Sequence, residues 1–176
     1  MGDIFVNLKR FEVPRELGGV CPQSDPVAWM KDALQRCKEL GLGDRKDVRL
    51  TFFVPEALIP AAVAAAQGAF AVGCQGVFRE NITPGGNFGA FTANLPATAA
   101  RNLGCSWSII GHSEERRDKL QVMQSFAPEI VSDSTLGQRA KSAVNQIINA
   151  EVLQALESGL NVLVCVGETA EERGGG

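Results

Sequence analysis

Short apolar runs alternate along this chain with longer segments in which apolar residues recur at helical spacing. The apolar runs predict five strands, at residues 4–9, 48–55, 69–77, 105–112 and 161–168. These runs show little alternation of apolar and polar positions, so we expect strands that are covered on both faces. That pattern is typical of a parallel sheet packed against helices.

The segments between the strands predict helices at residues 25–41, 56–67, 96–103 and 134–157. The first of them has the clearest boundaries, because Asp25 can cap its start, Pro26 suits the first helical position and Gly41 can end it. The polar segment that follows the fourth strand is poorly patterned, and we expect a charged loop there. Residues 78–91 form a second long loop, rich in glycine, asparagine and proline, whose length suggests a function.

Alternation of strands and helices predicts an α/β fold, built as a single domain over residues 1–176. Right-handed crossovers bring the carboxyl ends of parallel strands to one edge of the sheet, where ligand sites collect in such folds. The residues at or just past these ends are Lys9, Pro55, Val77, His112 and Glu168. A doubly wound five-stranded domain is an alternative, and it would need helices on both faces of the sheet.

The composition of the chain argues against two classes of partner, nucleic acids and membranes. The chain is 45% hydrophobic and 21% charged with a net charge of −3, and its basic residues are dispersed, so we expect neither a nucleic-acid partner nor a membrane partner. No apolar run reaches the ~18 residues of a membrane span and no targeting segment is evident, which favours a cytoplasmic protein. The five cysteines are odd in number and lack a C-x-x-C pair, so we interpret them as reduced thiols and expect no metal site.

Three polar side chains at predicted strand ends could carry chemistry. His112, the only histidine, follows a buried strand in the stretch Gly-His-Ser-Glu; a neutral imidazole there could donate a hydrogen bond to a carbonyl oxygen or move protons between oxygens. Lys9 could offer a fixed positive charge to a phosphate or an oxyanion. A structural histidine and a solvated lysine are the alternatives. For Glu168 a hydrogen-bonded structural acid is the preferred interpretation.

Four motifs in fixed order resemble one known family. "NLK" ends the first strand, "GAFT" precedes the third helix, "W-x-x-x-GHSEER" spans the fourth strand and "CVGE" the fifth. These are similar to N-W-K, G-A-F-T-G-E, W-x-x-x-G-H-S-E-R-R and C-I-G-E of the triose-phosphate isomerase family. The resemblance implies a (β/α)₈ barrel, of which this chain holds about five parallel strands with helices on the outer face. It also implies a cofactor-free isomerase that interconverts glyceraldehyde 3-phosphate and dihydroxyacetone phosphate, acting as a homodimer.

The same resemblance implies roles for four residues. Lys9 would bind the substrate phosphate and stabilise the enediolate, and Asn7 would orient Lys9 and the substrate. His112 would be the neutral electrophile at the carbonyl and hydroxyl oxygens, and Glu114 would contact Lys9 at the base of the site. The loop at residues 78–91 would reach across the dimer interface.

The chain also departs from the family pattern. A complete barrel of this kind needs ~250 residues, and we expect the 176 residues to be the amino-terminal part of a longer protein, without the family's A-Y-E-P-x-W-A-I-G-T-G segment that carries the general base. Glu115 stands where the family has an arginine, Ala93-Asn94 replaces Gly-Glu, and residues 118–133 are longer than the family norm. A non-catalytic barrel relative that binds a sugar phosphate or a protein is therefore an alternative.

Overall fold

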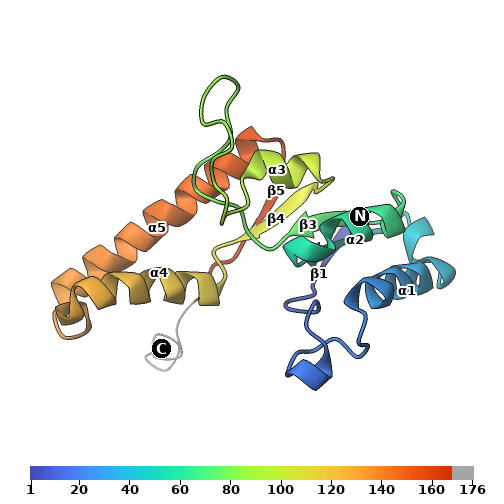
Figure 1. Ribbon diagram of the computed structural model, residues 1–176, viewed down its shortest axis with the longest axis horizontal. Helices are drawn as coiled ribbons and strands as arrows, with labels where there is room; N and C mark the ends of the chain where they lie inside the picture. The colour runs from blue at the N-terminus through green and yellow to red at the C-terminus, as the bar shows by residue number, and fades with distance from the viewer. Residues whose placement is uncertain (168–176) are drawn as a thin grey trace.

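The structure, a computed structural model, describes residues 1–167 (Figure 1). Its single sheet is entirely parallel and follows the chain order, β1-β2-β3-β4-β5. The strands are β1 (Gly2–Asn7), β2 (Val48–Val54), β3 (Ala71–Cys74), β4 (Trp107–Ile110) and β5 (Asn161–Val164). The five predicted strands and their parallel arrangement are confirmed.

The helices lie between successive strands, as the sequence predicts for four of them. They are α1 (Pro26–Glu39), α2 (Ile59–Ala66), α3 (Ala97–Asn102), α4 (Ser113–Phe126) and α5 (Ser134–Glu157). Asp25 caps α1, with its carboxylate accepting a hydrogen bond from Ala28 N–H at 2.9 Å. No helix of the described residues is long and apolar enough to cross a membrane.

The prediction of a charged loop after the fourth strand is wrong, because α4 occupies residues 113–126. None of its residues is buried, so it lacks the apolar stripe by which a helix is recognised in a sequence. Only Leu120 and Met123 pack against the core. The helix start also has an unusual cap, since His112 takes the position at which serine, threonine or aspartate is common.

Aromatic side chains fill the concave face of the sheet. The ring centroid of Phe5 on β1 lies 4.9 Å from that of Trp107 on β4, although two strands separate β1 from β4. Phe53 on β2 is fully buried beside them, 5.9 Å from Phe5. Its ring needs Gly73 on β3, because a Cβ atom there would lie 2.6 Å from the ring carbons. The sheet is therefore strongly curled, as in part of a barrel.

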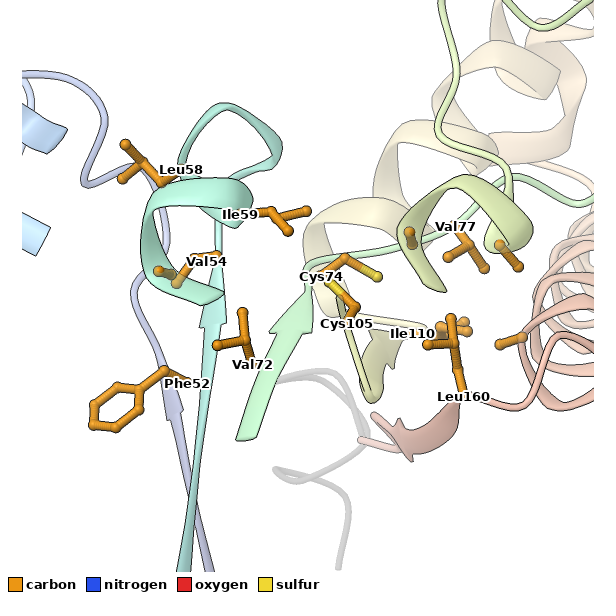
Figure 2. Packing of buried hydrophobic residues seen from close by; sticks show 14 of the residues in the cluster. Phe52, Val54, Leu58, Ile59, Val72, Cys74, Val77, Cys105, Ile110 and Leu160 are labelled. Atoms are coloured by element: carbon orange, nitrogen blue, oxygen red, sulfur yellow. The ribbon is translucent and has the colours of Figure 1, made fainter. Parts of the chain in front are cut away.

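The convex face of the sheet carries the main hydrophobic core. Alternate strand residues such as Phe52, Val54 and Val72 point to this face, where they meet Leu58 and Ile59 (Figure 2). Buried residues of α1 and α5 extend the same core. Because the helices cover one face and aromatic side chains the other, the doubly wound alternative is excluded. The fold is an incomplete (β/α)₈-type barrel with its helices outside.

Candidate active site

The carboxyl ends of β1, β3 and β4 converge on a cavity of about 340 Å³ on the concave side. Ligand pockets are commonly about 300–1,000 Å³, so this one suits a small molecule. Its lining consists of Asn7, Lys9, Arg10, Val20, Gln75, Ile109, His112, Glu114 and Glu115. The structure thus brings together all four residues that the sequence singles out, Asn7, Lys9, His112 and Glu114.

Lys9 follows β1 in a left-handed backbone conformation, with φ of 40°. This conformation is unfavourable for a residue with a side chain, by about 1–2 kcal/mol. The Asn7 carboxamide offsets part of that strain, because its Oδ1 accepts a hydrogen bond from Lys9 N–H at 2.9 Å. No hydrogen-bond or ion-pair partner of the Lys9 ammonium lies among the described residues, so the charge is available to an anion.

Gln75, just after β3, holds the same turn from the other side. Its Nε2 donates to Asn7 Oδ1 at 3.0 Å and to the Lys9 carbonyl oxygen at 2.7 Å. The apolar pattern alone did not indicate this residue, because "AFAVGCQGV" resembles a single strand from end to end. The signal was present, since Gln75 is a polar residue at the carboxyl end of a buried strand, like Asn7 and His112.

His112 caps the start of α4 at the carboxyl end of β4. Its Nδ1 accepts a hydrogen bond from Glu114 N–H at 3.4 Å. A nitrogen that accepts carries no proton, so the neutral imidazole has its proton on Nε2, which has no partner among the described residues. The Glu114 carboxylate lies 3.8 Å from the same Nδ1, but its side chain is 79% exposed, so water weakens any attraction and the backbone contact decides the tautomer.

The two glutamates after His112 differ in their surroundings. The expected contact between Glu114 and Lys9 is not formed as an ion pair, because the Glu114 carboxylate turns toward His112 and solvent. Glu115 instead points inward, where its Oε2 accepts the Gly111 N–H at 2.7 Å and its Oε1 meets Lys119 Nζ at 2.6 Å. Glu115, which the sequence marked only as a departure, is therefore the half-buried carboxylate of the site.

Gly111 links the strand to His112 and is fixed on both sides. Arg116 donates to its carbonyl oxygen at 2.7 Å, while Glu115 accepts from its N–H. Its φ is +83°, and a Cβ atom there would lie 2.9 Å from the Arg116 guanidinium and 3.1 Å from the Cys165 carbonyl oxygen. Only glycine fits this position without displacing a neighbour.

The long loop at residues 78–91 protrudes from the body of the molecule (Figure 1). Within the loop, Phe88 is fully exposed. The rings of Phe78 and Phe91, the first and last residues of the loop, lie 5.4 Å apart. Glu168, the remaining strand-end candidate, lies outside the described residues.

A family model described as "Triosephosphate isomerase" matches residues 27–176. The chain belongs to the triosephosphate isomerase family. It is 31% identical over 132 residues to the triosephosphate isomerase of Candida albicans, covering 74% of this chain and 42% of that protein. It is 36% identical over 88 residues to the enzyme of Polynucleobacter asymbioticus, covering 50% of this chain and 26% of that protein.

The fold of a family member matches as well. The crystal structure of triosephosphate isomerase from Bartonella henselae aligns with 98% of this chain at a TM-score of 0.61 and 24% identity, over 54% of its own length. The chain thus spans about half the length of that relative. This likeness confirms the incomplete barrel that the order of motifs implies.

Proposed function

We propose that this chain provides half of the active site of an isomerase that interconverts glyceraldehyde 3-phosphate and dihydroxyacetone phosphate through an enediolate. One observation carries the proposal: the Lys9 ammonium and the His112 Nε2, neither of which has a partner among residues 1–167, line the same small cavity. Membership of the family supports it.

The substrate phosphate would bind at Lys9. The ammonium offers charge-assisted hydrogen bonds to phosphate oxygens, and the turn that Asn7 and Gln75 hold keeps its backbone in place. A phosphate bound at Lys9 orients the three-carbon chain relative to the imidazole. Holding the reacting groups in this orientation lowers the entropic part of the barrier.

His112 would then act on the two oxygens of the triose. An Nε2–H donor polarises the carbonyl, stabilises the charge that develops on its oxygen as the enediolate forms, and can pass a proton between the adjacent oxygens. The nearby ammonium of Lys9 stabilises the same negative charge. Removal of the carbon-bound proton needs a base, and we assign that step to none of the described residues.

Two further parts of the proposal concern assembly and location. We infer that the exposed loop at residues 78–91 packs against a second copy of the chain, because Phe88 at its end has no contact that shields it from water. We also propose a cytoplasmic location, which the family membership of the chain supports.

The test is isomerisation of glyceraldehyde 3-phosphate by the protein as its gene encodes it. We expect His112→Gln to lower kcat by two to four orders of magnitude, the usual contribution of a positioned proton-transfer group, with the circular dichroism spectrum unchanged. A folded wild-type protein without isomerase activity would instead favour the non-catalytic relative, and a His112→Gln variant of unchanged kcat would remove the role assigned to the imidazole.

A further inference from the structure

Three charged side chains meet between α4 and α5, behind the cavity. The Lys119 ammonium on α4 lies 2.6 Å from Glu115 Oε1 and 3.0 Å from Glu151 Oε1 on α5. All three are shielded from water, with side chains 19%, 24% and 6% exposed for Lys119, Glu115 and Glu151. Two carboxylates thus share one ammonium at a helix interface, where an excess charge is unfavourable.

One of the two carboxyl groups, that of Glu151, keeps its proton, which reduces the excess negative charge of the cluster. Burial, followed by the neighbouring Glu115 carboxylate, raises the pKa of Glu151 to about 8. Burial acts against ionisation of Glu115 too, but its contacts with Glu151, Lys119 and Gly111 outweigh it and lower the pKa of Glu115. At neutral pH the cluster therefore contains ionised Glu115, cationic Lys119 and protonated Glu151.

An independent geometric feature agrees with this assignment. Glu151 Oε2 is buried and has no hydrogen-bond donor among the described residues, which would be unfavourable for a carboxylate oxygen. A protonated oxygen needs no donor and can itself donate, and the Glu115 carboxylate is the neighbour that can accept.

Glu115 connects this cluster to the imidazole. It is the third residue of α4, and its Oε2 accepts the N–H of Gly111, the residue before His112. Its other oxygen is held by Lys119, so a change in the cluster moves or loosens the contact with Gly111.

We propose that Glu115 is a positioning residue for His112, and that Glu151 in its protonated form, together with Lys119, holds Glu115 against the Gly111 N–H. The effect on catalysis rests on the proposed function, whereas the effect on the imidazole does not. The assignment differs from the one implied by the motif, since Glu114 is exposed and Glu115 is the carboxylate built into the fold.

Two further ionisable groups lie beside the cluster, Arg116 on α4 and Cys165 after β5. Arg116 of α4 contacts Gly111 and Cys165, and Cys165 follows β5. Burial raises the pKa of the Cys165 thiol, which Arg116 lowers and Glu115 raises again, so this thiol titrates above its ordinary range rather than near that of Glu151.

The test uses the ¹⁵N resonances of the imidazole, which are unambiguous because the chain has one histidine. As the pH rises through about 8, Glu151 loses its proton and Glu115 loses a hydrogen bond, so we expect the Nδ1 and Nε2 shifts to show an inflection there. Glu151→Gln, an isosteric mimic of the protonated form, should remove the inflection and keep the low-pH spectrum. Glu129→Gln, an exposed carboxylate at the far end of the same helix pair, should leave it unchanged.

Glu115→Gln should change the tautomer equilibrium of His112 at all pH values, and should lower kcat about tenfold with KM within twofold of wild type. If Glu115→Gln fails to fold, Glu151→Gln alone decides, because its shape matches the native carboxyl group. An inflection near pH 8 that persists in Glu151→Gln, or the lack of one near pH 8 in wild type, would overturn the proposal. If the wild type shows the inflection but has no isomerase activity, the proposed function alone is contradicted. If it has activity but shows no inflection, only the role of the cluster is contradicted.

Discussion

The two ends of the sheet differ in the contacts that hold their helices. Around β2 and β3, α1 and α2 pack apolar side chains against the strands, and residues such as Met30, Leu34 and Ile59 are almost fully buried. Around β4 and β5, α5 also packs apolar side chains such as Val144 and Ile148 into the core, but α4 buries no residue and is held largely by charged and hydrogen-bonded groups. Apolar packing thus stabilises the sheet at both ends, while the polar contacts of α4 make the geometry at His112 depend on groups that titrate.

The hairpin of α4 and α5 extends well beyond the sheet (Figure 1). At 24 residues, α5 is about 36 Å long at 1.5 Å per residue. The far end exposes Val122, Phe126 and Val131, so it adds little to the core. Its inner half, in contrast, carries the cluster of Glu115, Lys119 and Glu151 that reaches the site.

The largest effect is expected where the sheet curls. Phe53→Ala removes a fully buried ring from the concave face and leaves a cavity beside Gly73, so the free energy of unfolding should fall by about 3–5 kcal/mol. Urea denaturation measures this loss. Phe126→Ala, at a position that is 92% exposed at the end of α4, is the matched control and should change stability by less than about 0.5 kcal/mol. Equal effects of the two variants would show that the concave face is not packed as described.

The second largest effect is the pH dependence of stability, which we assign to Glu151 between α4 and α5. Glu151 has a pKa of about 8 in the folded chain and an ordinary value near 4.5 when unfolded. Between these values the folded state binds one more proton, so its stability falls as the pH rises from about 4.5 to 8 and is level above that. Relative to Glu151→Gln, the wild type should lose on the order of 3 kcal/mol between pH 5 and 8.5.

Urea denaturation at several pH values measures this difference. Glu129→Gln should follow the wild-type curve. A Glu151→Gln variant with the same pH dependence as wild type would mean that Glu151 is ionised in the folded chain.

A smaller effect is expected at two glycines with similar backbone angles. Gly41 after α1 has φ of +71° and open space around its Cα, so Gly41→Ala should lower the free energy of unfolding by about 1 kcal/mol. Gly111 adds close contacts with Arg116 and Cys165, so Gly111→Ala should lose about 1–2 kcal/mol more and also shift the His112 resonances. If both variants lose the same amount, the fit around Gly111 is looser than the contacts indicate.

Much of the scaffold could be predicted because apolar runs and caps are local signals. The strands and the convergence of Lys9 and His112 followed from the alternation of strands and helices, and the start of α1 followed from the cap at Asp25. Asn7 was indicated by the family resemblance. The helix α4 could not be predicted, since its stability comes from an imidazole cap, the Glu115–Lys119 pair and tertiary contacts. The inward direction of Glu115 rather than Glu114 depends on the helical phase after residue 112, which no residue pattern fixed.

The most direct test of the central claim is binding of 2-phosphoglycolate, which carries a phosphate and a carboxylate resembling the enediolate, followed through the His112 imidazole resonances. If Lys9 and His112 act on one ligand in one cavity, wild-type protein should show a saturable shift of Nε2, and Lys9→Met should weaken the affinity at least tenfold. A wild-type spectrum that does not respond, or a Lys9→Met variant that binds with unchanged affinity, would contradict the account.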